Sequence, residues 1–217
     1  SPDATTMNQQ HQRFDAAIDQ LRRQQLTPPR LHFANTAATL VNPDLHYDMV
    51  RVGLGLYGLY PAPHLRSYLT LKPAMQVKAR ITHIKEVPEG TGVSYGHHYV
   101  TSRPTRVAVV GIGYADGVPR ALSNQIQVIV KGQLAPQIGT ITMDQLMLDA
   151  THIPDLQEGD IVTLLGEDAN HSIGADDWAA LTHTISWEIL CGFKHRLPRI
   201  TAKQISEAPS QSLSRGR

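Results

Sequence analysis

The sequence predicts two regions of different fold class, an α/β region followed by an all-β domain that ends in a short helical hairpin. Near the N-terminus, two short apolar segments each run into a turn of small residues or glycines, which is typical of βα units in a parallel sheet. Beyond residue 70, apolar and polar residues alternate and turn residues recur at short intervals, as in a small barrel or sandwich. With 41% hydrophobic residues among 217, the chain can bury a core without disulfides or metals.

The α/β region is predicted over residues 1–69. Its helix places Phe14, Ile18 and Leu21 on one stripe, and Asn35 can cap the turn after the first strand. In order, its predicted elements are a helix over residues 7–25, a strand over 31–34, a capped turn over 37–40, and a strand over 47–52 that enters a glycine-rich segment over 53–58.

The all-β domain is predicted over residues 70–201, and a flexible tail over 202–217. Asp176 and Asp177 fall in the first turn of a helix whose apolar face holds Trp178 and Leu181. A second short helix places Cys191 in the core. The predicted strands begin at the alternating segment 77–82 and continue over 106–114, 125–130, 137–148 and 160–165.

Composition excludes several kinds of partner. Twenty basic and nineteen acidic residues leave a net charge of +1, so we expect neither nucleic acid nor an anionic membrane surface as a partner. No apolar run approaches the roughly 18 residues that a membrane span needs. The single cysteine suits a reducing compartment, and we expect a cytoplasmic location.

A literal G-x-G-x-x-G pattern runs from Gly53 to Gly58. It does not predict a dinucleotide site, because prolines soon interrupt the chain and no acidic residue follows at the required distance of about 20 positions. Two interpretations stay open. The N–H groups of Gly53 and Leu54 can bind one phosphate group together with the hydroxyl of Thr36, or the segment is a tight turn at the end of a strand.

Two tyrosines are candidate acid/base residues, because Tyr95 and Tyr114 both lie in glycine-rich segments and loops on rigid sheets often carry function. A tyrosine acts as a base only where a nearby cation favours its phenolate form. A structural tyrosine held by hydrogen bonds is the alternative. None of the eleven histidines forms an H-x-x-x-H pair or lies beside a pair of cysteines, so we do not expect a metal site.

Six motifs, in their order and spacing, resemble those of the alanine racemase family. They are His32-Phe-Ala-Asn-Thr-Ala-Ala38, Asp48-Met-Val-Arg-Val-Gly-Leu-Gly-Leu-Tyr-Gly58, Val93-Ser-Tyr-Gly96, Gly113-Tyr-Ala-Asp-Gly-Val-Pro-Arg120, Gly139-Thr-Ile-Thr-Met-Asp-Gln145 and Ile185-Ser-Trp-Glu-Ile-Leu-Cys191. The resemblance covers residues 10–201, and six ordered motifs are far more specific than any one of them.

The resemblance implies a fold, a cofactor and a reaction. The α/β region is then the C-terminal remnant of a (β/α)8 TIM-type barrel that holds pyridoxal 5'-phosphate (PLP), and a C-terminal β-barrel-like domain follows it. The implied reaction interconverts L-alanine and D-alanine for peptidoglycan, in a homodimer whose site is shared across the interface. The family's Lys-Ala-Asp-Ala-Tyr-Gly segment, which bears the Schiff-base lysine, does not occur among these residues, so we expect this chain alone to be inactive.

The resemblance also assigns roles to individual residues. It implies that Tyr95 is the catalytic tyrosine, which exchanges a proton at Cα on the face opposite the lysine and acts in the partner subunit's site. It implies that Met143 and Tyr114 are substrate-binding residues. The implied cofactor-binding residues are Arg51 at the pyridine nitrogen, and Thr36, Gly53, Leu54 and Trp187 at the phosphate.

Two of these positions depart from the family's pattern. Thr36 stands where serine is usual, and Trp187 stands where tyrosine is more common, so that an indole N–H can donate one hydrogen bond there but cannot accept one. Two alternative functions stay open. One is a related enzyme, either a racemase of broader amino-acid specificity or a decarboxylase that shares the barrel, and the other is a non-catalytic dimerisation or complementation module.

Overall fold

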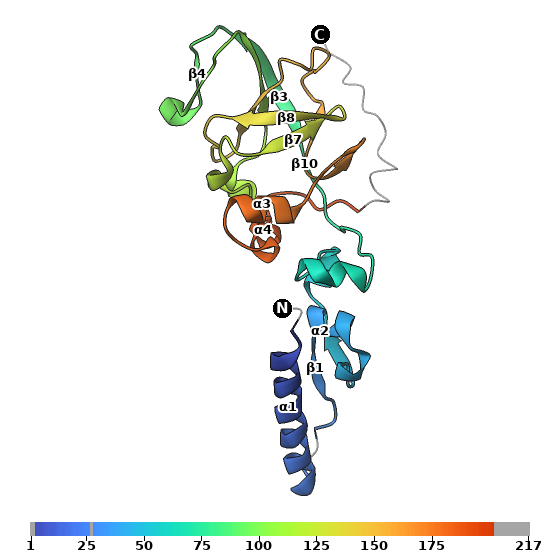
Figure 1. Ribbon diagram of the computed structural model, residues 1–217. Coiled ribbons are helices and arrows are strands. Elements are labelled where there is room, and N and C mark those ends of the chain that lie inside the picture. Colours follow the sequence, from blue (N-terminus) through green and yellow to red (C-terminus); the bar gives the residue numbers. More distant parts are fainter. Residues whose placement is uncertain (1–2, 27, 202–217) are drawn as a thin grey trace. The chain divides into compact units, whose positions relative to one another are not determined.

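The structure, a computed structural model, describes residues 3–26 and 28–201 (Figure 1). The chain forms two compact units, one of residues up to 78 together with 163–173, and one of residues 79–162 together with those from 174 onward. The predicted flexible tail over 202–217 lies outside the described residues. Within the described ranges, no helix is both long enough and apolar enough to cross a membrane.

The first unit contains a long helix and a pair of parallel strands, as the βα pattern predicts. Asn35 at the end of β1 lies opposite Arg51 at the end of β2. Asn35 also caps the next helix, because its side chain accepts a hydrogen bond from the N–H of Ala38 at 3.1 Å. The elements are α1 (Thr5–Arg23), β1 (His32–Asn35), α2 (Thr36–Val41) and β2 (Met49–Arg51), with 3-10 turns η1 (Pro43–Leu45), η2 (Leu54–Tyr57) and η3 (Pro63–Ser67).

Aromatic and polar contacts fasten α1 to the strands of this unit. The ring of Phe14 lies 5.3 Å from that of Phe33 and 5.2 Å from that of Tyr47, between centroids. The hydroxyl of Tyr47 donates to Asp15 at 2.5 Å and lies 2.6 Å from Nε2 of His11. Burial, the hydrogen bond to Asp15 and the charge of Asp15 raise the pKa of Tyr47 to about 12.

A second sheet, with seven strands, closes on itself (Figure 1). The strand order is β11, β10, β3, β6, β9, β8, β7, and β10 also pairs with β7. This extra pairing decides between the two predicted architectures in favour of a small barrel, whose interior is filled by fully buried side chains such as Val110, Val128 and Leu148. The strands are β3 (Val77–Val87), β6 (Thr105–Val110), β7 (Gln127–Val130), β8 (Gln133–Ile138), β9 (Leu146–Asp149), β10 (Ile161–Asp168) and β11 (His171–Ile173).

Two predicted strands are wrong in their extent. The strand predicted over 137–148 is the end of β8 and the start of β9, separated by a loop over 139–145. Gly139 turns the chain out of β8 with a φ of +75°, a conformation that glycine adopts without strain. The strand predicted over 106–114 ends at Val110 as β6. Apolar residues continue through both loops because the loops pack against the barrel, so alternation alone does not mark where a strand ends.

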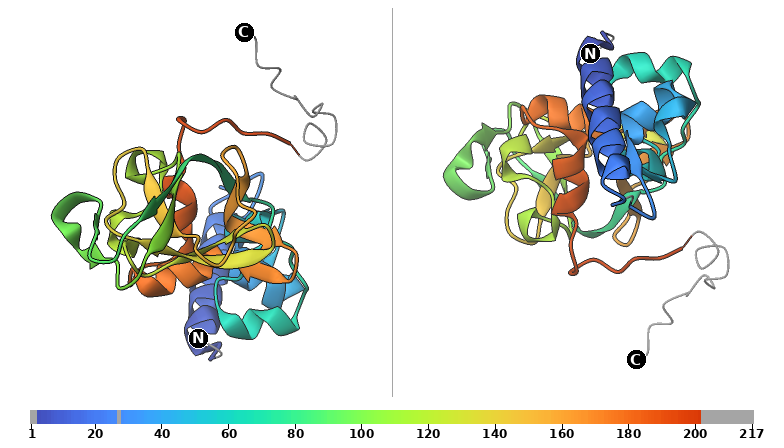
Figure 2. Two further views of the ribbon diagram at one scale, coloured as in Figure 1. Left: turned by 90° about the horizontal axis from the view of Figure 1, so that it is seen from above. Right: turned by 90° about the horizontal axis from the view of Figure 1, so that it is seen from below.

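A short hairpin absent from the sequence prediction carries the loop of Tyr95. β4 (Gly92–Val93) and β5 (Tyr99–Val100) pair antiparallel and have only two residues each, too few to show an alternating pattern. The hairpin and its loop, drawn in green, project from the other strands in all the views of Figures 1 and 2.

The predicted helical hairpin is present as α3 (Ala175–Leu181) and α4 (Ser186–Gly192), which pack against each other. Trp178 is buried, as predicted. The predictions for Leu181 and Cys191 are wrong, because both are exposed. Each helix has only two turns and therefore buries a single narrow stripe.

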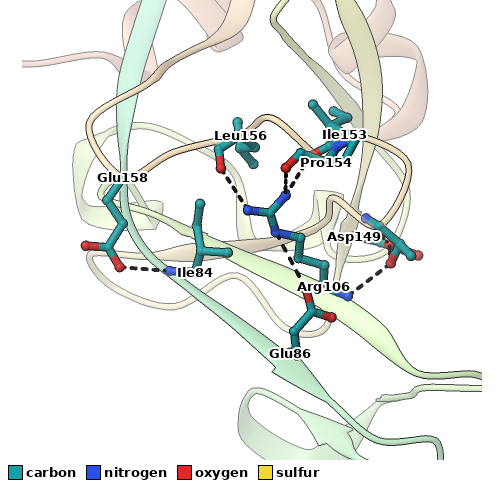
Figure 3. A network of polar contacts seen from close by, with 9 residues as sticks. Ile84, Glu86, Arg106, Asp149, Ile153, Pro154, Leu156 and Glu158 are labelled. Carbon is teal, nitrogen blue, oxygen red and sulfur yellow. Dashed lines mark hydrogen bonds and ion pairs between the residues drawn. The ribbon is translucent and has the colours of Figure 1, made fainter.

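The side chain of Arg106 on β6 anchors a loop that has no regular structure of its own (Figure 3). Its guanidinium donates to the carbonyl oxygens of Ile153 at 2.9 Å, Pro154 at 2.6 Å and Leu156 at 2.8 Å. Ile153 and Leu156 are buried, so these carbonyl groups need an internal donor. One arginine thus provides for three backbone acceptors.

Candidate functional site

The predicted phosphate-binding residues come together in the first unit. Because β1 and β2 are parallel, the segments that follow them emerge at the same edge of the sheet, and these segments contain Thr36 and Gly53. The N–H of Gly53 donates to Oγ1 of Thr36 at 3.0 Å. A Cβ on Gly55 would lie 2.9 Å from Cγ2 of Thr36, so a glycine here allows the close approach. Leu54 is the first residue of η2 in the same segment.

Arg51 lies at the end of β2, where it contacts a residue that the sequence analysis did not assign. Its Nη1 donates to Nδ1 of His32 at 2.7 Å, which requires His32 to be neutral with its proton on Nε2. His32 begins the first of the six motifs. A signal for this pairing was available, because His32 and Arg51 belong to neighbouring parallel strands and the guanidinium is long enough to reach across.

This group of donors fits a phosphorylated heteroaromatic cofactor such as PLP. The hydroxyl of Thr36 accepts from Gly53 and keeps its own proton for a phosphate oxygen. The first N–H groups of the η2 turn, which starts at Leu54, have no acceptor within the turn. Among the described residues beyond its two chain neighbours, no atom lies within 4 Å of a Cβ built on Gly53, so the space beside this backbone is open. The guanidinium of Arg51 is a fixed donor suited to a ring nitrogen.

In the second unit, the loops of Tyr114 and Met143 lie against each other. Tyr114 is in the 3-10 turn η5 (Tyr114–Asp116), and its N–H donates to the carbonyl of Thr142 at 2.9 Å. The N–H of Ala115 donates to the carbonyl of Met143 at 3.1 Å. A Cβ on Gly113 would lie 2.2 Å from the carbonyl oxygen of Thr142, so the two backbones meet at a distance that only glycine permits.

The loop of Tyr95 is held to the same region by two hydrogen bonds that run in opposite directions. Oγ of Ser94 donates to the carbonyl of Thr140 at 2.6 Å, and Oγ1 of Thr140 donates to the carbonyl of Tyr95 at 2.9 Å. Ser94 and His97 have positive φ values of 64° and 46°, which is strained for these residue types. Tyr95 itself is 76% exposed and free to reach outward. Sequence reasoning did not identify Thr140, which lies 45 positions away from Tyr95.

The remaining predicted site residue, Trp187, lies near the start of α4 in the second unit and is 38% exposed. The structure therefore brings together Arg51, Thr36, Gly53 and Leu54 in one unit, and the loops of Tyr95, Tyr114 and Met143 in the other. Within the described part of the chain, no group of three or more His, Cys, Asp or Glu side chains is placed to hold a metal ion.

Comparisons with protein families give two successive matches. The alanine racemase C-terminal domain matches residues 74–201, and the alanine racemase N-terminal domain matches residues 1–61. A curated relative, alanine racemase from Nostoc sp., is 62% identical over 200 residues, which are 92% of this chain and 52% of the relative. The chain thus spans about half the length of the curated relatives that it matches.

Solved structures give the same result. Alanine racemase from Bacillus anthracis with bound L-Ala-P superposes with a TM-score of 0.86 at 34% identity, covering 92% of this chain and 51% of that one. Alanine racemase from Bartonella henselae with covalently bound pyridoxal phosphate has a TM-score of 0.76 at 33% identity, covering 91% of this chain and 52% of that one.

Proposed function

Because this chain belongs to the alanine racemase family, we propose that it forms part of a PLP-dependent isomerase that interconverts L-alanine and D-alanine. The observation that carries the proposal is the set of donors at the ends of two parallel strands, where Thr36, Gly53 and Arg51 offer a hydroxyl, an open backbone and a guanidinium. The named ligands of the similar solved structures, L-Ala-P and covalently bound pyridoxal phosphate, support the choice of substrate and cofactor.

In this proposal the first unit holds the cofactor. Thr36 and the N–H of Leu54 bind the phosphate, while the N–H of Gly53 donates to the hydroxyl of Thr36 and orients its proton towards a phosphate oxygen. Arg51 donates to the pyridine nitrogen but keeps its proton, because a guanidinium stays charged at neutral pH. His32 holds the guanidinium in place from the other side. When bound, PLP supplies the electron withdrawal that makes the Cα proton of alanine removable.

The second unit supplies the groups that act on alanine. Racemisation needs an acid/base group on each face of Cα, and the hydroxyl of Tyr95 takes or gives the proton on one face. Met143 contacts the substrate carboxylate, and Tyr114 narrows the approach to it. Tyr95 acts in the site of the other subunit of a homodimer, and its exposure on a projecting loop is consistent with that role. We place the enzyme in the cytoplasm, where its product serves peptidoglycan synthesis.

The test uses a full-length protein in which this chain follows the part of the Nostoc relative that it does not cover. That part is chosen because the Lys-Ala-Asp-Ala-Tyr-Gly segment, whose lysine the resemblance assigns to cofactor attachment, does not occur among these 217 residues. We expect the purified protein to bind PLP and to racemise alanine in both directions. Failure to exchange the Cα hydrogen of alanine with solvent deuterium would contradict the proposed function.

Within that protein, Tyr95→Phe removes the proposed acid/base hydroxyl and keeps the ring. We expect turnover to fall about 100-fold or more in both directions, the range that removal of a positioned acid/base group typically gives. Tyr99→Phe on the same hairpin is the matched control, because the ring of Tyr99 packs on the apolar cluster of Val87 and Val93 and should keep turnover near wild type. If both variants turn over alanine like the parent, Tyr95 is not the catalytic group.

A further inference from the structure

One arginine of the second unit joins two carboxylates that belong to the loops of Tyr114 and Met143. Arg196 follows α4 in the chain, 80 positions after Asp116 and 52 after Asp144. Its Nε donates to Oδ1 of Asp116 at 2.9 Å, and its Nη2 donates to Oδ1 of Asp144 at 2.6 Å. The fork of a guanidinium fixes the spacing of two acceptors in a way that a single ammonium group cannot.

Asp116 links Arg196 to the turn that carries Tyr114. The other carboxylate oxygen, Oδ2, accepts the N–H of Gly113 at 2.9 Å, so Asp116 closes the η5 turn from within. Asp116 is buried, with only 7% of its surface exposed. A buried carboxylate needs a charged partner, and Arg196 is the cation that reaches it.

Asp144 links Arg196 to the loop that carries Met143. Asp144 follows Met143 directly in the chain, and its side chain is well exposed. An ion pair that holds Asp144 in place therefore also restrains the backbone at Met143. Hydrogen bonds to Asp144 and Asp116, together with their charges, raise the pKa of the Arg196 guanidinium above its ordinary value. Arg196 also separates two negative charges that would otherwise repel each other across the two loops.

We propose that Arg196 is a positioning residue that fixes the distance between the Tyr114 turn and the Met143 loop, and thereby the size of the space offered to the substrate. The inference rests on the proposed function, since that function makes Tyr114 and Met143 substrate contacts. Arg196 acts through Asp116 and Asp144, the carboxylates that it contacts. It acts on the affinity for alanine through the loops, whereas Thr36, Leu54 and Arg51, which bind the cofactor in the proposed function, belong to the other unit.

The test compares Arg196→Gln with Arg199→Gln in the full-length protein described above. Arg199 is a matched control three positions on, because its Nη2 donates to the carbonyl of Phe193 and not to a carboxylate. We expect Arg196→Gln to raise KM for alanine about fivefold with kcat reduced less than twofold, the pattern of lost ground-state positioning. Affinity for PLP should stay at the parent value. An unchanged KM, or an equal loss of PLP affinity, would overturn the inference.

Amide hydrogen exchange gives a second measurement that does not require activity. Arg196→Gln should speed exchange in the segments 113–117 and 139–145 at least threefold, while the strand β7 keeps its protection. Unchanged exchange in both loops would overturn the inference even if the protein proved inactive towards alanine. Conversely, faster loop exchange in a protein that does not racemise alanine would refute the proposed function and leave the positioning role of Arg196 supported.

A double-variant cycle separates positioning from general stability. If Arg196 acts through Asp144, then Asp144→Asn should raise KM in the same direction, and adding Arg196→Gln should raise it by less than the product of the two single effects. Arg196→Lys should recover only part of the parent KM, because an ammonium group cannot hold both carboxylates in the same fork. Fully multiplicative effects, or complete recovery with lysine, would contradict the proposal.

Discussion

The two units of this chain hold their site residues in different ways. In the first, Arg51 ends β2 and contacts His32 of the adjacent strand, and Thr36 and Gly53, each just past the end of a strand, hydrogen-bond to each other. In the second, Tyr95, Tyr114 and Met143 lie on loops outside a closed sheet, and contacts between loops position them. The proposed cofactor-binding residues are thus positioned by the sheet itself. The proposed substrate-facing residues lie on loops, which hydrogen bonds between the loops hold in place.

The largest expected change in the free energy of unfolding comes from substituting a glycine where two loop backbones are in close contact. Gly113→Ala puts a Cβ 2.2 Å from the carbonyl oxygen of Thr142, which cannot move without shifting its loop. We expect the free energy of unfolding to fall by about 3 kcal/mol or more in urea titrations. In the first unit, the nearest atoms to a Cβ at Gly55 are side-chain methyl groups of Thr36 and Val52, at 2.9 and 3.1 Å, so Gly55→Ala should cost about 1 kcal/mol.

Gly174→Ala is the control for this pair. Gly174 has extended backbone and precedes a helical turn as Gly113 does, and its N–H is also accepted by an aspartate three residues on. The nearest atom to its Cβ is a side-chain oxygen at 3.4 Å, so the variant should lie within about 0.5 kcal/mol of the parent. If Gly113→Ala and Gly174→Ala lower the free energy of unfolding equally, the close contact between the Tyr114 and Met143 loops does not exclude a Cβ, and the prediction is wrong.

Substitution of Arg106 tests whether a barrel side chain also stabilises a loop outside the candidate site. Arg106→Met keeps the length of the side chain but leaves three carbonyl groups without their donor. We expect a loss of about 2 kcal/mol in the free energy of unfolding. Arg80→Met, which removes a bond to the single carbonyl of Gly159, should cost less than about 1 kcal/mol. If Arg106→Met lowers the free energy of unfolding less than Arg80→Met does, the contacts of Arg106 shown in Figure 3 do not anchor the loop.

A smaller effect, which depends on pH, is expected in the first unit at Tyr47. Its pKa is raised to about 12, so the stability that the neutral hydroxyl contributes is present below the ordinary value near 10 and is lost as the pH rises through about 12. At pH 8, Tyr47→Phe should be less stable than the parent by about 1 kcal/mol, because the bonds to Asp15 and His11 are gone. Urea unfolding at pH 8 and pH 12 should show this difference shrinking. A difference that is constant with pH would contradict the shifted pKa.

Much of the fold could be predicted because local patterns encode it. The parallel pair β1 and β2, the cap at Asn35 and the helical hairpin all follow from a few adjacent residues. Errors arose where the local signal was weak. The strands of the β4–β5 hairpin are too short to alternate, and the apolar loop over 139–145 looks like a continued strand.

The sequence by itself determined which chemical groups are available and in what order, because six motifs keep the residue types of a known family at that family's spacing. Only the tertiary structure decided which of these groups meet. His32 reaches Arg51, Thr140 holds the Tyr95 loop, and Arg196 joins Asp116 to Asp144, across separations of 19 to 80 positions. No local period encodes such contacts. The first contact exists because β1 and β2 pair side by side. The other two exist because the seven-stranded sheet closes and brings loops from distant parts of the chain to the same place.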